Sequence, residues 1–194
     1  SGHTVSSGAE ESGTERNATQ ILEFAGMPSS LVATKNLDYI EATKELKAGD
    51  IDAFFCTAGL TTTVIDELSK ECDIRLIPLT DTVISKMLES SSAYTSEVIP
   101  AGTYTGQTTD ISTIGVKSVL ITKSDVSDDT IEKLTSLLFE KENELSYSNS
   151  LKLELTYDFA TDDMPIPFHN GAKRYYEDYG YCLLYTSPSP RDTR

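Results

Sequence analysis

The regular alternation of strand-length and helix-length segments constrains this chain more than any other feature. "HTVSS" alternates as an extended segment does, a Gly/Ser/Glu loop follows it, and apolar residues then recur at helical spacing over 18–25. Gly26 and Pro28 close that helix, because glycine accepts a left-handed cap and proline cannot continue the hydrogen-bond ladder. The pattern predicts a strand, a loop and a helix in that order.

The same alternation continues to about residue 90. Helices are predicted for "LDYIEATKELKAG", "TTTVIDELSKE" and "TDTVISKMLESS", the last of them capped by Thr80 or Asp81. Between them, "IDAFFC" and "DIRLIPL" are apolar runs of strand length. Alternation of this kind favours an open, largely parallel α/β sheet.

The pattern changes in the second half of the chain. Pro100, Gly102 and Gly106 mark a loop, and the β-branched stretch from Ile111 to Thr122 is long enough to leave one lobe and enter another. The segments after it are mainly helical: "SDDTIEKLTSLLFEK", "ENELSYSNSLKLELTYDFA" and "FHNGAKRYYEDYG". We expect the last helix to finish at Gly180.

The final stretch, residues 182–194, differs in kind from the rest. "CLLYTSPSPRDTR" resembles the translation of a transposon end with its attached sequencing adapter, and it is therefore excluded from reasoning about the fold. A genuine, disordered C-terminal tail is the alternative interpretation.

Composition excludes several classes of partner. The net charge of −15, from 31 acidic and 16 basic side chains, repels phosphate backbones and anionic lipid, so nucleic acid and membrane surfaces are disfavoured. The sequence shows neither a signal peptide nor an apolar run that would insert into a membrane. With three cysteines, two histidines and no zinc-type spacing, we expect no disulfide framework, no metal site and no cofactor.

Two segments carry candidate ligand chemistry. "SGTERNA" places Ser12, Gly13 and Thr14 at a helix start, where unpaired backbone N–H groups and hydroxyls suit a carboxylate, although plain N-capping is the alternative. "CTAGL" places Ala58 and Gly59 after a buried strand, at the edge where open α/β sheets bind ligands. A tight strand-to-helix turn is the alternative there.

The reactive side chains favour no catalytic site. The sequence places no base beside Cys56, so a small buried hydrophobe is the simpler interpretation of this cysteine. His169 precedes a tyrosine-rich helix, where bonding to neighbouring backbone is commoner than a ligand role. Tyr175, Tyr176 and Tyr179 are spaced as one packed helical face. Since no general base is evident, we expect that the protein is not an enzyme.

Four segments in order, "SGTERNATQILEFAGM", "LKAGDIDAFFCTAG", "IPAGTYTGQTTDISTIGV" and "PIPFHNGAKRYYEDYG", resemble the later portion of the TAXI family of TRAP-transporter solute-binding proteins. The resemblance covers residues 1–181. It implies an α/β, periplasmic-binding-protein-like fold of type II, with two lobes and a ligand cleft. Residues 1–109 would form the complete second lobe. Residues 110–181 would form the crossover strand and the helices that return to an incomplete first lobe, as in a fragment cut at both ends.

The resemblance also implies a function. It would place Ser12, Gly13, Thr14, Ala58, Gly59 and Tyr104 against the ligand. The protein would be a periplasmic or membrane-anchored subunit, with its secretion signal upstream, that delivers a small organic anion to a TRAP membrane permease. Many amino-acid-binding relatives of this fold have a carboxylate after the I-D-A strand, and this chain does not, so a dicarboxylate or oxo-acid is as plausible as glutamate. A ligand-sensing domain of the same fold in a signalling protein is the alternative.

Overall fold

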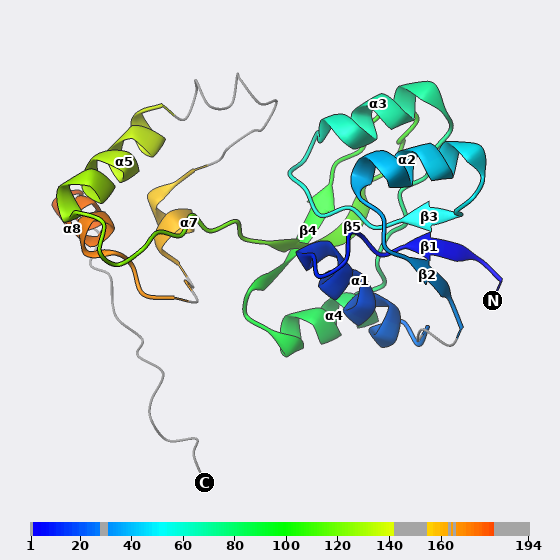
Figure 1. Ribbon diagram of the computed structural model, residues 1–194, viewed down its shortest axis with the longest axis horizontal. Helices are drawn as coiled ribbons and strands as arrows, with labels where there is room; N and C mark the ends of the chain where they lie inside the picture. The colour runs from blue at the N-terminus through cyan, green and yellow to red at the C-terminus, as the bar shows by residue number, and fades with distance from the viewer. Residues whose placement is uncertain (1, 28–30, 142–154, 163, 165, 181–194) are drawn as a thin grey trace, which may run out of the picture. The chain divides into compact units, whose positions relative to one another are not determined.

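The computed structural model describes residues 2–27, 31–141, 155–162, 164 and 166–180. The described residues form two compact units, one built on residues 1–118 and the other on the helices that follow residue 119 (Figure 1). The helix predicted to run through 142–154 and the adapter-like segment 182–194 lie outside the described residues.

A three-stranded parallel sheet forms the centre of the first unit. Its strands are β1 (Thr4–Ser6), β2 (Ala33–Lys35) and β3 (Ala53–Phe54), arranged in the order β2-β1-β3. Val5 of the middle strand lies opposite Thr34 on one side and Ala53 on the other. The prediction of a parallel α/β sheet is therefore confirmed for this part of the chain.

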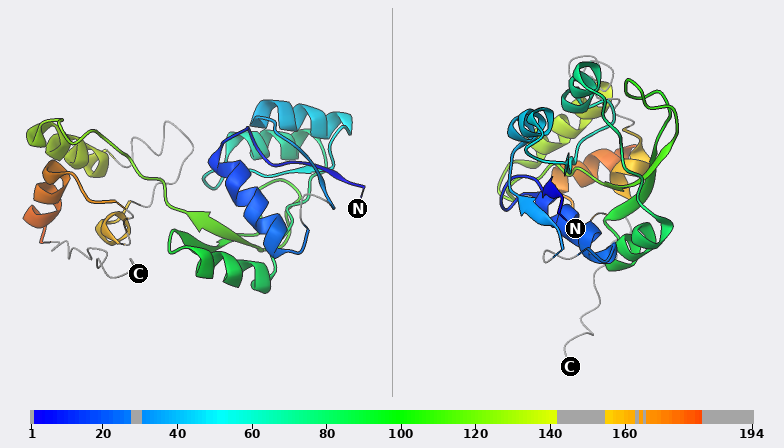
Figure 2. Two further views of the ribbon diagram at one scale, coloured as in Figure 1. Left: turned by 60° about the horizontal axis from the view of Figure 1, so that its bottom comes forward. Right: turned by 90° about the vertical axis from the view of Figure 1, so that its right-hand side faces the viewer.

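Helices cover both faces of this sheet. They are α1 (Gly13–Phe24), α2 (Tyr39–Ala48), α3 (Thr63–Glu71) and α4 (Asp81–Ser90). In Figures 1 and 2, α2 and α3 lie side by side on one face, and α1 and α4 lie on the other. The neighbouring strands β1 and β3 are thus followed by helices on opposite faces, which makes the gap between their carboxyl ends a topological switch point.

Local capping chemistry sets the helix ends, as the sequence predicts. The Ser12 hydroxyl accepts the backbone N–H of Glu15 at 3.1 Å at the start of α1, and Thr80 caps α4 in the same way. Gly26 and Gly49 follow their helices with φ of 73° and 79°, the left-handed conformation that glycine adopts at least cost.

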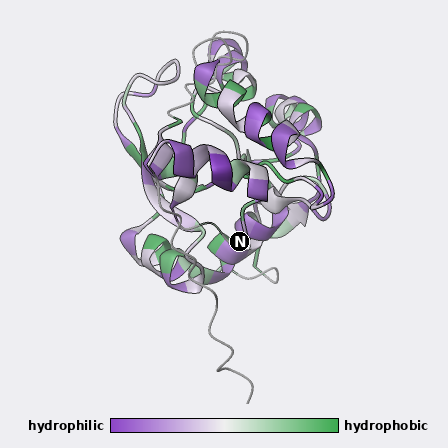
Figure 3. Ribbon diagram, turned by 90° about the vertical axis from the view of Figure 1, so that its left-hand side faces the viewer, coloured by the Kyte–Doolittle hydropathy of each residue, from purple (hydrophilic) through white to green (hydrophobic). Residues whose placement is uncertain are grey.

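The apolar core of the first unit lies between α1 and α4. Ile21, Val83 and Met87 are buried at its centre. Around them pack the partly buried side chains of Phe24, Phe55, Leu79, Tyr94 and Ile114. Hydrophilic and hydrophobic residues alternate along the helices (Figure 3), as expected of helices that cover a core with one face.

The structure corrects three strand predictions. Tyr94–Ile99 forms an unpredicted strand, β4, which pairs antiparallel with β5 (Ile111–Val116). The β-branched stretch stops being a strand at Val116 and does not continue to Thr122. The strand predicted for "DIRLIPL" is wrong: residues 73–79 join no sheet, although the Leu79 N–H donates to the Ser112 carbonyl at 2.9 Å.

The second unit is helical where the structure describes it. Its helices are α5 (Asp128–Glu140), α7 (Tyr157–Thr161) and α8 (Asn170–Asp178). α8 packs on α5 so closely that a Cβ placed on Gly171 would lie 2.1 Å from the Asp128 carbonyl oxygen. The expected boundary at residues 109 and 110 remains a prediction, and β5 pairs within the first unit.

Aromatic rings complete the contact between the helices of the second unit. Tyr175 and Tyr176 are buried, which confirms their predicted packing, whereas Tyr179 is 57% exposed with its ring 4.8 Å from that of Tyr175. Phe139 stacks on Tyr157 with ring centroids 4.4 Å apart. None of the helices in the described ranges is long and apolar enough to cross a membrane.

Candidate functional site

The residues predicted to bind a ligand gather at the carboxyl edge of the parallel sheet. The loop after β1 leads into α1 at Ser12, Gly13 and Thr14, and the loop after β3 carries Ala58 and Gly59. Because β1 and β3 are neighbours, the two loops flank the switch point between them. Open α/β sheets bind their ligands at such a point, so topology alone brings these two predicted segments together.

The first turn of α1 satisfies some of its own donors. Ser12 accepts the Glu15 N–H, and the Glu15 carboxylate in turn accepts the Glu11 N–H at 2.7 Å, an arrangement close to a capping box. The capping alternative is therefore realised. It does not exhaust the site, because the Ser12 hydroxyl proton stays available for an acceptor and Gly13 is exposed.

Tyr39, which the sequence analysis did not single out, links the two loops. Its hydroxyl lies 2.9 Å from the Thr14 hydroxyl. It also donates to the Thr57 carbonyl at 3.0 Å and accepts the Thr57 N–H at 3.1 Å. The first turn of α1 is thereby tied to the loop that carries Ala58 and Gly59.

Asn36, just beyond β2, holds the loop after β1 in a similar way. Its side-chain amide donates to the Gly8 carbonyl at 3.1 Å and to the Glu15 carboxylate at 2.7 Å. Gly8 has φ of 102°, and a Cβ there would lie 2.8 Å from the side chain of Thr14. Only glycine fits this close approach of the loop to the helix.

Tyr104 contacts the start of α3. Tyr104 is only 7% exposed, and its hydroxyl lies near the backbone N–H groups of Thr62 and Thr61. Thr62 is the N-cap of α3 and makes no side-chain cap bond. Burial raises the pKa of the Tyr104 phenol, which keeps it protonated at neutral pH.

Cys56 lies beside this network as a free thiol. Burial raises its pKa, and the nearby Tyr39 side chain offsets part of that shift. A thiol with a raised pKa is a poor nucleophile at neutral pH, because only the thiolate attacks.

Backbone strain is concentrated in the two loops of the candidate site. Within the described ranges, Glu11 and Thr61 are the only residues other than glycine with positive φ, at 61° and 58°. Glu11 precedes α1 and Thr61 precedes α3. A β-branched residue in this conformation is costly, and such residues occur preferentially at ligand-binding sites.

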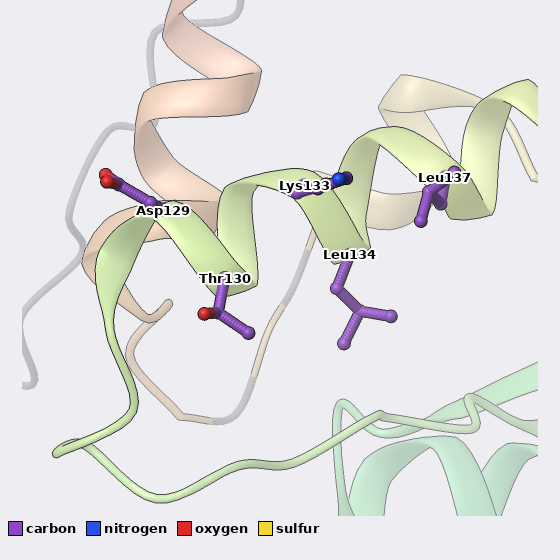
Figure 4. A pocket seen from close by; sticks show the side chains of 5 residues that line it. All are labelled: Asp129, Thr130, Lys133, Leu134 and Leu137. Atoms are coloured by element: carbon purple, nitrogen blue, oxygen red, sulfur yellow. The ribbon is translucent and has the colours of Figure 1, made fainter.

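The predicted features of the last helix have structural roles. His169 caps α8, because its Nδ1 accepts the Gly171 N–H at 3.1 Å, which confirms the bonding to neighbouring backbone. A shallow hollow on the second unit (Figure 4) is lined by side chains of α5 alone: Asp129, Thr130, Lys133, Leu134 and Leu137. None of the predicted ligand residues lines it.

Comparison with known families identifies the family of this chain. Residues 1–180 match the NMT1-like family. It is a periplasmic-binding-protein-like family that includes TAXI-type proteins, and the α/β unit with its parallel sheet is consistent with that fold. The match suggests a solute-binding role in a transporter, and the family is typically extracytoplasmic.

Proposed function

The chain belongs to the NMT1-like family, and from this premise we propose that it is the solute-binding subunit of a TRAP-type transporter of the TAXI kind. It binds a small organic anion outside the cytoplasm, encloses it between two lobes and delivers it to a membrane permease. The observation that supports this proposal best is the convergence of Ser12–Thr14 and Ala58–Gly59 on the switch point between β1 and β3.

The groups at this edge suit an anion held by neutral donors. Gly13, Ala58 and Gly59 are exposed, so their backbone groups are accessible to a solute. The Ser12 hydroxyl keeps a proton to donate, and the N-terminal end of α1 favours negative charge. Tyr104 and Thr14 are buried and shape the site from behind these groups.

We propose binding without a chemical step or a cofactor. Cys56 is held as a thiol by burial. The Tyr39 hydroxyl is bonded to backbone groups of the loop, and Tyr104 is buried. These side chains support the shape of the site, and none of them is activated as a base or nucleophile.

Titration calorimetry on the intact chain tests the class of solute. L-Glutamate, 2-oxoglutarate and succinate are the probes, with glucose and a cationic amine as controls. We expect one of the three acids to bind with a dissociation constant in the micromolar range or below. Binding of the sugar or the amine alone would show that the assignment of an anion is wrong.

Glu15 distinguishes an oxo-acid from an amino acid. Its carboxylate lies in the first turn of α1, close to the proposed solute, and accepts the Asn36 side-chain amide and the Glu11 backbone N–H. The substitution Glu15→Gln removes a repulsion from a dicarboxylate and should tighten its binding several-fold. A solute whose ammonium group faces this carboxylate should instead bind more weakly to the variant.

A further inference from the structure

The Tyr39 hydroxyl is the point at which three segments of the first unit meet. Tyr39 is the first residue of α2, and its oxygen lies within 3.1 Å of both backbone polar groups of Thr57 and within 2.9 Å of the Thr14 hydroxyl. Thr57 belongs to the loop after β3, and Thr14 belongs to the first turn of α1. One oxygen atom therefore connects both walls of the switch point.

The protons in this cluster have one consistent arrangement. A phenol has one proton to donate and can accept two hydrogen bonds. The Thr57 carbonyl cannot donate, so it takes the Tyr39 proton, and the Thr57 N–H occupies one acceptor position of the phenol. Thr14 must then donate its own proton to Tyr39. All hydrogen-bonding positions of the phenol are then occupied. Both the N–H and the carbonyl of Thr57 are bonded to it, and this pair of bonds is called the clamp.

The clamp acts on a strained loop. Four residues beyond Thr57, Thr61 has φ of 58°, a conformation that a β-branched residue keeps only when its surroundings hold it. At the far end of the loop, the buried Tyr104 lies beside Thr61 and Thr62. Tyr39 thus fixes one end of the loop by hydrogen bonds, and the exposed residues Ala58 and Gly59 lie between that anchor and the strained Thr61.

We propose that Tyr39 is a positioning residue of the solute site: its hydroxyl fixes the Cys56–Gly59 loop against the first turn of α1, and it acts on the solute through Thr57 and Thr14. This inference rests on the proposed function, because the loop is taken to be a wall of the solute site. Side chains that hold binding groups in place raise affinity by removing the cost of ordering them when the solute arrives.

Matched tyrosine variants of the full chain test the proposal. Tyr39→Phe removes the hydroxyl and keeps the ring. Tyr94→Phe is the control, because its hydroxyl also bridges elements of the first unit but contacts the side chains of Asn17 and Gln20, at 2.9 and 3.0 Å. It reaches Thr57 only indirectly, through a 3.5 Å bond from the Asn17 amide to the Thr57 side-chain hydroxyl. Both variants lose one hydrogen-bonded hydroxyl from a half-buried tyrosine, and only Tyr39→Phe loses a bond to the loop backbone.

Two readouts need no solute. Hydrogen exchange of the Thr57 amide, followed by NMR, should accelerate at least about tenfold in Tyr39→Phe and stay unchanged in Tyr94→Phe. Alkylation of Cys56, which lies next to Tyr39, should also accelerate. Cys72, which hydrogen-bonds to the Leu68 carbonyl in α3, serves as the internal reference in the same mass spectrum. Unchanged exchange in Tyr39→Phe, or equal acceleration in both variants, would overturn the proposal.

Affinity for L-glutamate and 2-oxoglutarate gives the third readout. We expect the dissociation constant to be about tenfold higher in Tyr39→Phe and unchanged in Tyr94→Phe. A loosened loop with wild-type affinity would overturn the link to the solute. If the wild-type chain binds neither acid, the proposed class of solute is wrong, while exchange at Thr57 still decides whether Tyr39 positions the loop.

A second pair of variants guards against misfolding of Tyr39→Phe. Thr14→Val removes the proton that Tyr39 accepts, and Thr14→Ser restores a hydroxyl at the same position. Thr57 exchange should accelerate in the valine variant and return close to the wild-type rate in the serine variant. Equal exchange in the two Thr14 variants would contradict the proton arrangement that supports the proposal.

Discussion

The starts of α1 and α8 use glycine in opposite ways. At α1, a Cβ on Gly13 would meet no atom within 4 Å, and the helix begins at an open sheet edge. At α8, a Cβ on Gly171 would enter the backbone of α5. The segment "SGTE" therefore leaves backbone groups accessible, whereas the segment "FHNGAKRYY" packs against α5. Motifs of similar composition thus serve a candidate binding site in one unit and packing in the other.

The largest expected effect tests that contrast at the two glycines. Gly171→Ala should destabilise the second unit by about 3 kcal/mol, because the added methyl group must push α8 away from the Asp128 carbonyl. Gly13→Ala should be neutral or slightly stabilising, since its Cβ has open space and alanine favours helix. Chemical denaturation of both variants measures the difference, and equal losses would contradict the comparison.

The next largest effect is the loss of stability that alkaline pH should cause where the helices of the second unit pack together. Burial and the neighbouring Tyr157 hydroxyl, 3.1 Å away, raise the pKa of Tyr175 above its ordinary value. The folded state therefore holds this proton more tightly than the unfolded chain does. The stability it contributes is complete below about pH 10 and is lost as the pH rises further.

The substitution Tyr175→Phe isolates this contribution, because the variant keeps the ring contacts with Phe139 and Tyr179. Thermal melting between about pH 8 and 11 covers the range around the ordinary tyrosine pKa. The melting temperature of the variant should depend less on pH over this range. An identical decline in both proteins would assign the alkaline loss to other groups.

Helix capping gives a smaller effect in the first unit. Ser12→Ala should cost about 1 kcal/mol of stability, because the Glu15 N–H loses its acceptor. Thr62→Ala should cost less, since Thr62 occupies the same capping position in α3 without a side-chain cap bond. Urea denaturation of the pair compares them, and a larger loss for Thr62→Ala would contradict the assigned caps.

The smallest expected effect concerns the ion pairs between α5 and α8. Arg174 lies 2.7 Å from Asp128, with Asp129 and Glu132 at 3.2 and 3.4 Å. Since water reaches all of these groups, Arg174→Met should lower the melting temperature only slightly, and the loss should shrink in high salt. A loss that does not change with salt would point to packing of the arginine stem instead.

Helix boundaries could be predicted from the sequence because their causes are local. Ser12, Thr80 and Gly49 cap helices through groups only a few residues away. Strands depend on distant partners. The apolar run at 73–79 forms none, while the polar segment Tyr94–Ile99 does, because β5 pairs with it over its whole length.

The same distinction between local signals and distant partners applies to the residues of the candidate site. Ser12–Thr14 and Ala58–Gly59 could be found because they follow strands in the sequence. Tyr39 could not, because its partners Thr57 and Thr14 lie 18 and 25 residues away and only the packing of α2 brings them within reach. Nor does the sequence reveal that Tyr104 is buried with its hydroxyl on the start of α3.

The absence of charge from the six predicted ligand positions has a consequence for the rate of binding. The six predicted ligand positions carry no formal charge, while the chain as a whole has a net charge of −15. An anionic solute therefore approaches against the field of the protein and is attracted only within reach of the amides and hydroxyls. Added salt screens that field, so association should become faster as ionic strength rises. Such a protein would distinguish solutes by how long they stay bound and hardly by how fast they arrive.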